Sequence, residues 1–135
     1  MERELGVRIF NGSMDPGVPV EEVMTTPLET VSADVTVVEA TKRMREKNIN
    51  ALVVRTDPPS IITSTDILDA VAAGQNLSEL TVADVMTESV ETVPPDLHLE
   101  EVAAMMTSLG IKHLPVVDED PIGMVSSTDI AAQLF

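Results

Sequence analysis

Several residue types that often carry chemistry are absent or scarce in this sequence. Its 135 residues include no cysteine, tryptophan or tyrosine and only two phenylalanines, Phe10 and Phe135. Without cysteine there are no disulfides and no thiol chemistry. With so few aromatic rings, a planar ligand has to lie between aliphatic side chains and backbone. No glycine-rich phosphate loop occurs, and no His, Asp or Glu spacing is typical of a zinc or calcium site. We therefore expect no metal and no cofactor.

Long apolar runs are also absent. No stretch reaches the roughly 18 consecutive apolar residues of a transmembrane helix, so we expect no membrane association. The first residues, Met1–Glu4, lack the basic and apolar regions of a signal peptide. A cytoplasmic protein is the default expectation. Apolar residues make up 44% of the chain, enough for one core or two small fused ones.

Positive charge is scarce as well. The chain has 8 Lys and Arg against 23 Asp and Glu, a formal net charge of −15. Such a charge repels phosphates, so we expect no nucleic acid partner. Lysine occurs only at Lys42, Lys47 and Lys112. Abundant acid with little lysine suits a halophilic cytoplasm, where salt screens the repulsion, and an ordinary acidic protein is the alternative.

An internal repeat is the main feature of what is present. Val20–Thr25 (VEEVMT) matches Val82–Thr87 (VADVMT), and Glu29–Val31 (ETV) matches Glu91–Val93 (ETV). We divide the chain into an N-terminal tail with a short strand within Leu5–Phe10, two repeats and a linker. Their bounds are 1–19 for the tail, 20–74 for the first repeat, 75–81 for the linker and 82–135 for the second repeat.

Each repeat predicts the same order of elements. A short apolar segment comes first, and a helix follows. In the first repeat, Thr36 and Glu39 have the spacing of a capping box. The helices should end near Asn48 and Gly110, since these residues tolerate a left-handed exit.

Two nearly all-apolar strands and a second helix complete each repeat. Such strands indicate burial on both faces. The second helix of the first repeat should stop at Gly74. The order β-α-β-β-α, present twice, predicts an α/β fold with two-fold pseudosymmetry. The predicted strands are 51–54 and 61–62 in the first repeat, and 114–117 and 122–125 in the second.

The sharpest functional signal is a corner between strand and helix that occurs twice, as Thr63–Ile67 (TSTDI) and Ser126–Ile130 (SSTDI). An aspartate in the first turn of a helix is favoured by the helix dipole. Its carboxylate can accept hydrogen bonds from both hydroxyls of a ribose, and helix-start amides can donate to a phosphate. Plain N-capping by Ser, Thr and Asp is the alternative.

These features together make the chain resemble a tandem pair of CBS domains, also called a Bateman module. The resemblance covers roughly residues 20–135. It rests on the Val-x-x-Val-Met-Thr segments, on Ile49-x-x-Leu52 and Ile111–Asp118 (IKHLPVVD), and on Thr63-x-x-Asp66 and Ser126-x-x-Asp129.

The resemblance implies a regulatory, non-catalytic module that binds an adenosyl compound such as AMP, ADP, ATP or S-adenosylmethionine. It implies two repeats packed sheet to sheet, with two ligand clefts related by a pseudo-two-fold axis. It also implies pairing of modules into a disc-shaped homodimer.

The resemblance further implies which residues line each cleft. An aspartate, Asp129 or Asp66, would hold the ribose, and strand backbone near Thr30 or Thr92 would read the adenine edge. The Asp129 cleft is expected to comprise Thr25, Thr30, Asn50, Ala51, Lys112, His113, Ser126, Thr128 and Asp129. The Asp66 cleft is expected to comprise Thr87, Thr92, Lys112, His113, Asn50, Thr63, Thr65 and Asp66.

The two clefts are expected to differ. CBS domains that bind phosphates often carry basic residues at the start of the first of the two strands. That position is Lys112-His113 in the second repeat and Asn50-Ala51 in the first. We therefore expect the Asp129 cleft to bind phosphorylated nucleotides better. His113 is either a ligand contact or a hydrogen-bonded structural residue. The first repeat also departs from the pattern at Ser60, where the second has Gly123.

We therefore predict a module that senses an adenosyl ligand and signals to a partner protein by a shift between conformations. Two alternatives belong to other classes: a structural dimerisation module with empty clefts, and a sensor of divalent ions. An enzyme is not expected, because no nucleophile–base pair or metal cluster is present.

Overall fold

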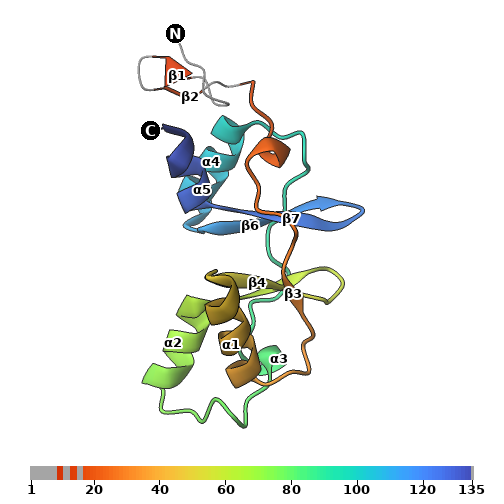
Figure 1. Ribbon diagram of the computed structural model, residues 1–135, viewed down its shortest axis with the longest axis vertical. Coiled ribbons are helices and arrows are strands. Elements are labelled where there is room, and N and C mark those ends of the chain that lie inside the picture. The colour runs from red at the N-terminus through yellow and green to blue at the C-terminus, as the bar shows by residue number, and fades with distance from the viewer. Residues whose placement is uncertain (1–8, 11–12, 15–16, 135) are drawn as a thin grey trace. The chain divides into compact units, whose positions relative to one another are not determined.

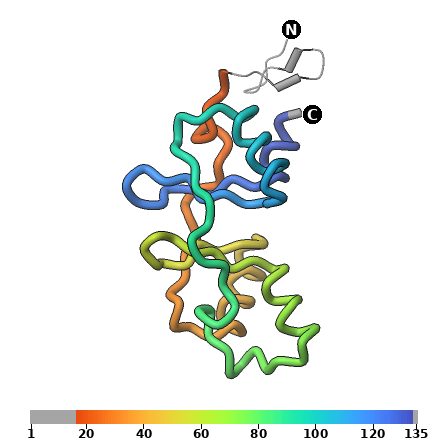
Figure 2. Tube along the Cα trace, turned by 180° about the vertical axis from the view of Figure 1, so that it is seen from behind, coloured from red at the N-terminus to blue at the C-terminus, as the bar shows by residue number. Residues whose placement is uncertain are grey.

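The computed structural model describes residues 9–10, 13–14 and 17–134. The chain forms two compact units (Figures 1 and 2). The first, here named the Asp66 unit, comprises Glu29–Val90. The second, named the Asp129 unit, comprises Met1–Leu28 together with Glu91–Phe135. Among the described residues, no helix is long and apolar enough to cross a membrane.

The Asp66 unit is built on a three-stranded sheet in the order β3-β4-β5. β3 (Thr30–Val31) is parallel to β4 (Ala51–Val54), and β4 is antiparallel to β5 (Ser60–Thr63). All four residues of β4 are buried, which confirms the expectation from its apolar sequence. The helices α1 (Val37–Lys47) and α2 (Ser64–Ala72) lie on one face of this sheet (Figure 1).

The ends of these helices follow local rules. Thr36 Oγ1 accepts from the amide of Glu39 at 3.1 Å, and Glu39 Oε1 accepts from the amide of Thr36 at 3.4 Å, so the predicted capping box is confirmed. α1 ends at Asn48, which is left-handed with φ 56°. Gly74, just after α2, has φ 77°. Asn48 and Gly74 therefore have the left-handed conformation that the sequence indicated for the ends of these helices.

The Asp129 unit is built on a hairpin of β6 (His113–Asp118) and β7 (Asp120–Ser126). Val93 forms a parallel bridge with Val116, in the place that β3 takes in the other unit. α4 (Leu99–Leu109) ends at Gly110 in the left-handed region, as predicted. α5 (Ser127–Ala131) and the 3₁₀ helix η2 (Ala132–Leu134) follow β7. The expected N-terminal strand is described at Ile9–Phe10 (β1), paired with β2 (Ser13–Met14), and residues 5–8 lie outside the described part.

The opening segment of each repeat belongs to the compact unit formed by the body of the other repeat. The 3₁₀ helix η1 (Val20–Glu22) and Thr25 lie in the Asp129 unit, where Thr25 pairs with Met124 of β7. α3 (Val82–Val85) and Thr87 lie in the Asp66 unit, where Thr87 pairs with Ile61 of β5. The compact units and the sequence repeats therefore divide the chain at different residues.

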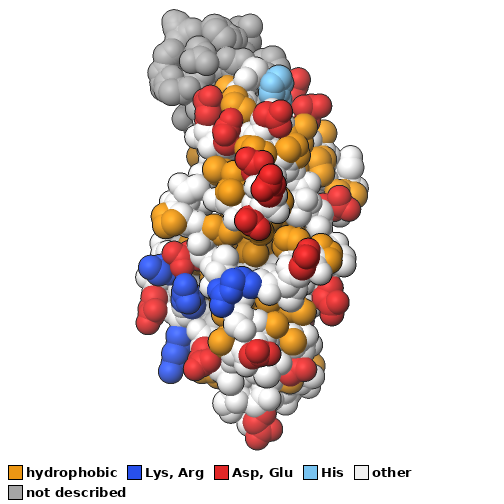
Figure 3. All heavy atoms as spheres, turned by 90° about the vertical axis from the view of Figure 1, so that its right-hand side faces the viewer, with side chains coloured by type: hydrophobic (Ala, Val, Ile, Leu, Met, Phe, Trp, Pro, Cys, Tyr) orange, Lys and Arg blue, Asp and Glu red, His pale blue; other side chains and the backbone are white. Residues whose placement is uncertain are grey.

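Basic side chains are unevenly distributed over the described residues. The Asp66 unit has Lys42, Arg43, Arg45 and Lys47 on α1 and Arg55 after β4, whereas the described part of the Asp129 unit has only Lys112. Figure 3 shows Lys and Arg side chains gathered on one part of the visible surface, whereas Asp and Glu side chains are spread over the whole of this face. Glu29 pairs with Arg43 at 3.3 Å and with Lys47 at 3.8 Å, so part of this positive charge is neutralised locally.

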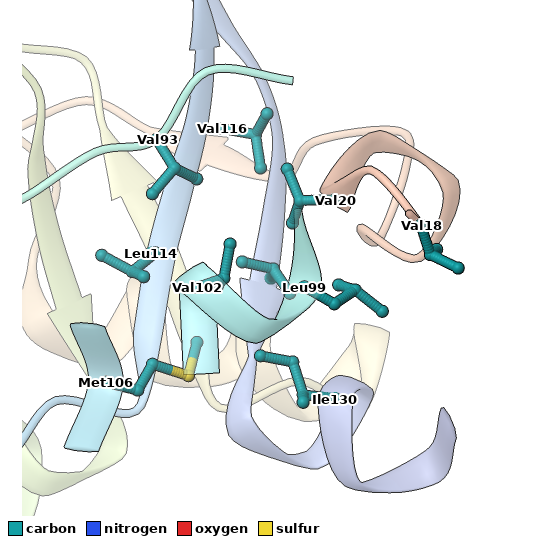
Figure 4. Close-up of a cluster of buried hydrophobic side chains, with 10 residues drawn as sticks. Val18, Val20, Val93, Leu99, Val102, Met106, Leu114, Val116 and Ile130 are labelled. Atoms are coloured by element: carbon teal, nitrogen blue, oxygen red, sulfur yellow. The ribbon is translucent and has the colours of Figure 1, made fainter. Parts of the chain in front are cut away.

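Each unit has its own hydrophobic core. In the Asp129 unit, Val20 from the opening segment packs with Val93 and Val116 (Figure 4). Leu99, Val102 and Ile130 bring α4 and α5 into the same cluster. The core of the Asp66 unit consists of Val31, Val37, Ala40, Met44, Leu52, Val54, Ile62, Ile67 and Val82. Each core is thus completed by a valine, Val20 or Val82, from an opening segment.

Candidate functional site

Both predicted corners form as N-terminal caps of short helices. At the β7–α5 corner, the Ser126 amide donates to Asp129 Oδ2 at 2.9 Å and the Asp129 amide donates to Ser126 Oγ at 3.1 Å. At the β5–α2 corner, the amide and the hydroxyl of Thr63 donate to Asp66 Oδ2 at 2.9 and 3.1 Å. The capping interpretation is therefore confirmed at both corners.

Capping does not use the whole carboxylate. In both aspartates the side-chain oxygen that accepts these hydrogen bonds is Oδ2, and among the described residues none donates to Oδ1. A carboxylate has lone pairs on both oxygens, so each corner keeps an acceptor for another group. Because Oδ2 is fixed by the cap, the direction of Oδ1 is fixed too, and capping and ligand binding are compatible roles for the same residue.

Three further groups surround Asp129 within its own unit. Thr25 Oγ1 lies 3.5 Å from Asp129 Oδ2, although 104 residues separate the two in the chain. His113 pairs with Ser126 across the β6–β7 hairpin. The Lys112 carbonyl accepts from the Ser127 amide at 2.9 Å, which fixes the start of β6 against the start of α5. The corner thus collects a carboxylate, hydroxyls and an imidazole.

The electrostatics of His113 reflect this position. Its side chain is partly buried, and burial is the main cause that lowers its pKa from the ordinary 6.5. The negative charge of Asp129 raises the pKa, and the positive charge of Lys112 lowers it further. Since desolvation prevails, His113 is neutral at pH 7 and can both donate and accept a hydrogen bond.

The corresponding corner of the Asp66 unit is less polar. Ala51, which pairs with Thr63, takes the place of His113 and is buried. The Asn50 carbonyl accepts from the Ser64 amide at 2.9 Å, as Lys112 does for Ser127. The backbone arrangement is therefore the same in both units, while the imidazole and the ammonium group are missing from this one.

The structure divides the predicted site residues between the two units. Thr25, Thr92, Lys112, His113, Ser126, Thr128 and Asp129 lie in the Asp129 unit, and Thr30, Asn50, Ala51, Thr63, Thr65, Asp66 and Thr87 lie in the Asp66 unit. Within the units, the structure brings Thr25, His113 and Ser126 to Asp129, and Asn50, Ala51 and Thr63 to the Asp66 corner. Each predicted cleft also includes residues of the other unit, and that grouping stays a prediction.

The sequence interpretation did not include Arg55. Its Nη1 donates to Thr30 Oγ1 at 2.6 Å, and no acidic partner pairs with it among the described residues. The sequence feature that could have pointed to Arg55 is its position directly after an all-apolar strand. Arg55 follows the last residue of β4, about 13 Å along the strand from Ala51, so it does not replace the missing basic group at the start of that strand.

A groove of about 470 Å³ lies in the Asp66 unit between α1 and α2. Its lining is mixed, with apolar Met44, Ile67 and Leu68 beside polar Arg45 and Asn48. Leu68 is 66% exposed and Val71, one turn later on α2, is 53% exposed. The outer face of α2 therefore presents apolar side chains to solvent.

Comparison with known proteins identifies the family. The family model described as CBS domain matches residues 20–73 and 82–135. The chain belongs to the CBS domain family. Its two matched segments form a tandem CBS pair, as the repeat predicted.

Relatives of this CBS pair include longer proteins. An uncharacterised protein of Methanopyrus kandleri is 35% identical over 119 residues, which are 84% of this chain and 61% of the relative. A homoserine O-acetyltransferase of Methanohalobium evestigatum is 36% identical over 118 residues, which are 83% of this chain but 23% of that enzyme. The chain thus spans less than two thirds of the length of either relative.

Solved structures share the fold. The CBS domain pair of protein MJ0100, in complex with 5′-methylthioadenosine and S-adenosyl-L-methionine, is 31% identical with a TM-score of 0.78. The alignment covers 87% of this chain and 95% of that one. The α/β fold with two CBS repeats is therefore shown by sequence and structure together.

Proposed function

We propose that this CBS pair is a regulatory module that binds an adenosyl compound at the Asp129 corner. The observation that carries the proposal is the Asp129 carboxylate, whose Oδ2 is fixed by the Ser126 amide at 2.9 Å while no residue in the described part of the chain donates to Oδ1. The adenosyl ligands of the MJ0100 pair support the ligand class. In an adenosyl compound, the vicinal hydroxyls of the ribose are the donors that such a carboxylate accepts.

The groups around Asp129 suit the rest of such a ligand. The Thr25 hydroxyl and the neutral His113 imidazole can each donate or accept a hydrogen bond beside the ribose. Lys112 adds a positive charge to the same corner, which favours a ligand that carries phosphate. The Asp66 corner has Ala51 and Asn50 at these positions. We therefore propose that phosphorylated nucleotides bind more tightly at Asp129 than at Asp66.

The signalling step uses the chain connections between the units. Thr25 lies three residues before the boundary at Leu28, and Thr87 lies three residues before the boundary at Val90. A ligand that contacts Thr25 stabilises those conformations in which the connecting segment holds Thr25 beside the ligand. Ligand binding thereby shifts the population toward the conformation that binds the ligand more tightly. The size of the shift is set by the ratio of the ligand's affinities for the conformations. A partner protein that binds one conformation would read this shift.

The regulatory role also fits the match to an acetyltransferase. The chain corresponds to 23% of that enzyme. We propose that this segment is a sensing part and that the catalytic groups of the enzyme lie elsewhere in it. The proposal for the present chain is accordingly ligand binding without turnover.

Self-association belongs to the same proposal. Leu68 and Val71 stand one turn apart on the exposed face of α2, beside the groove next to α1. Burying what remains exposed of these two side chains stabilises an interface by about 2–4 kcal/mol before the cost of association. We propose that a second copy of this chain covers that face, forming a homodimer.

Calorimetric titration tests the ligand proposal. The purified protein is titrated in high and low salt with AMP, ADP, ATP, S-adenosylmethionine and methylthioadenosine, and separately with Mg²⁺ alone. We expect saturable binding of at least one adenosyl compound, and a larger loss of nucleotide affinity in Asp129→Ala than in Asp66→Ala. Binding of Mg²⁺ alone would favour the ion sensor. The absence of any binding would favour a purely structural dimerisation module, and equal losses in the two variants would refute the asymmetry.

A further inference from the structure

Gly123 on β7 is a close contact point for the opening segment of the chain. A Cβ atom at this position would lie 2.5 Å from Met24 Sδ, 2.9 Å from Met24 Cγ and 3.3 Å from Met24 Cβ. Side-chain atoms do not approach one another that closely. The Met24 side chain therefore fills the space that any other residue at 123 would need. The constraint at this glycine is one of space and not of backbone conformation, since its φ lies outside the left-handed region.

The contact between Met24 and Gly123 is directly linked to the candidate site. Thr25 follows Met24, and its amide donates to the Met124 carbonyl at 2.7 Å, while the Met124 amide donates to the Thr25 carbonyl at 3.3 Å. Thr25 Oγ1 then lies 3.5 Å from Asp129 Oδ2. This distance is at the limit of a hydrogen bond, so a displacement of a few tenths of an ångström decides whether the hydroxyl reaches the carboxylate.

The Asp66 unit provides an internal comparison. There Ser60 takes the position of Gly123, is 2% exposed, and lies with its hydroxyl 2.7 Å from Thr56 Oγ1. Thr87 pairs with Ile61 as Thr25 pairs with Met124. Among the described residues, however, no hydrogen bond joins Thr87 to Asp66. The threonine of the opening segment reaches the carboxylate only in the unit that has the glycine.

We propose that Gly123 is a positioning residue that, by leaving room for Met24, places the Thr25 hydroxyl beside Asp129 as a ligand contact. The inference rests on the proposed adenosyl site and assigns to that site a specificity element that the Asp66 corner lacks. A methyl group at 123 meets Sδ and Cγ of Met24 most closely, so the Met24 side chain has to move away and the Met24–Thr25 segment shifts with it. Met24→Ala removes both of these atoms and leaves only the milder contact with Cβ.

A thermodynamic cycle tests this in the full chain. We expect Gly123→Ala to weaken binding of the adenosyl ligand about fivefold, the effect of one hydrogen bond of ordinary strength. The double variant Met24→Ala/Gly123→Ala should bind within about twofold of Met24→Ala, because the smaller side chain restores the room. In a Thr25→Val background, Gly123→Ala should cause no further loss of affinity. Ser60→Ala is the matched control and should leave binding at Asp129 unchanged.

The cycle separates positioning from general destabilisation. A merely structural glycine would lower affinity equally with and without the Thr25 hydroxyl, and that result would overturn the proposal, as would unchanged affinity in Gly123→Ala. If Gly123→Ala alone does not fold, the proposal still requires Thr25→Val to lose affinity about fivefold. It also requires the rescued double variant to bind like Met24→Ala, and failure of either requirement overturns it.

A measurement without ligand distinguishes this inference from the proposed function. Amide hydrogen exchange at Thr25 and Met124 reports the pairing of the two segments. Gly123→Ala should accelerate exchange at both amides, and the additional Met24→Ala should restore protection. Unchanged protection in Gly123→Ala would overturn the positioning role even if the ligand binds. If the wild-type protein binds no adenosyl compound, the proposed function fails while hydrogen exchange still decides whether Gly123 places Thr25.

Discussion

Replacing Asp129 separates its capping role from its proposed ligand role. Asp129→Ala removes the acceptor for the Ser126 amide, bonded at 2.9 Å, and the negative charge in the first turn of α5. Loss of this hydrogen bond costs about 1 kcal/mol, and loss of the charge at the helix start costs about 0.5 kcal/mol. The N-cap residue Ser126 keeps its bond from the amide of residue 129. We therefore expect the free energy of unfolding to fall by about 1–2 kcal/mol in this variant.

Asp129→Asn keeps an oxygen that can accept from the Ser126 amide, so it should lose only about 0.5 kcal/mol. It cannot, however, offer two acceptor oxygens to the two hydroxyls of a ribose. Since a hydrogen bond to a charged group contributes about 1.5–3 kcal/mol, ligand affinity should fall at least about tenfold in both variants. Stability and affinity are thus predicted to change independently.

Urea unfolding and calorimetric titration measure the two quantities. Asp84→Ala is the matched control, because Asp84 caps α3 by accepting from the Thr81 amide at 2.8 Å but is not a predicted ligand contact. It should lose stability like Asp129→Ala and keep the affinity. The reasoning is refuted if Asp129→Asn binds the ligand as tightly as the wild type, or if Asp84→Ala loses affinity as strongly as Asp129→Ala.

Three further predictions concern the core, pH and self-association. Leu52→Ala and Leu114→Ala each remove a fully buried side chain from one unit, so urea unfolding should show losses of about 2–5 kcal/mol, and a loss under about 1 kcal/mol would contradict the packing. Burial lowers the pKa of His113 in the folded state from 6.5, so the unfolded chain binds the proton more readily and stability should fall as pH drops through and below 6.5. Unfolding at several pH values should show a flatter dependence in His113→Gln than in the wild type, and an equal dependence in the two proteins would contradict the effect assigned to His113. Leu68→Glu places a charge on the exposed face of α2 and should weaken dimerisation more than about tenfold in sedimentation equilibrium; an unchanged dissociation constant would place the interface elsewhere.

Local sequence rules predicted the elements because the interactions that define them are local. The Thr36 and Glu39 capping box and the exits at Asn48 and Gly110 are confirmed. Burial on both faces is confirmed for β4, whereas in β7 Ile122 and Met124 are only partly buried. The two corners are predictable for the same reason, since each capping box spans only four residues. What the sequence could not show is where the opening segment of each repeat packs.

The missing information concerns contacts between residues far apart in the chain. The approach of Thr25 to Asp129 spans 104 residues and leaves no local pattern. Arg55 and Thr30 likewise lie on neighbouring strands whose pairing depends on the sheet as a whole. In the sequence, Ser60 is only a departure from Gly123, because the Met24 side chain that occupies the space beside Gly123 comes from another segment. The sequence therefore predicts which residues form the site, whereas the contacts among them, such as that of Thr25 with Asp129, come from the structure.

An amide NMR titration with the tightest adenosyl ligand tests the central claim most directly. Resonances of the wild-type protein are followed to saturation and mapped onto the chain. The account predicts that the largest shifts occur at Thr25, His113, Ser127, Thr128 and Asp129, where the carboxylate, the hydroxyls and the helix-start amides meet. A saturating ligand that leaves these amides unmoved, or the absence of any shift with every adenosyl compound, would contradict it.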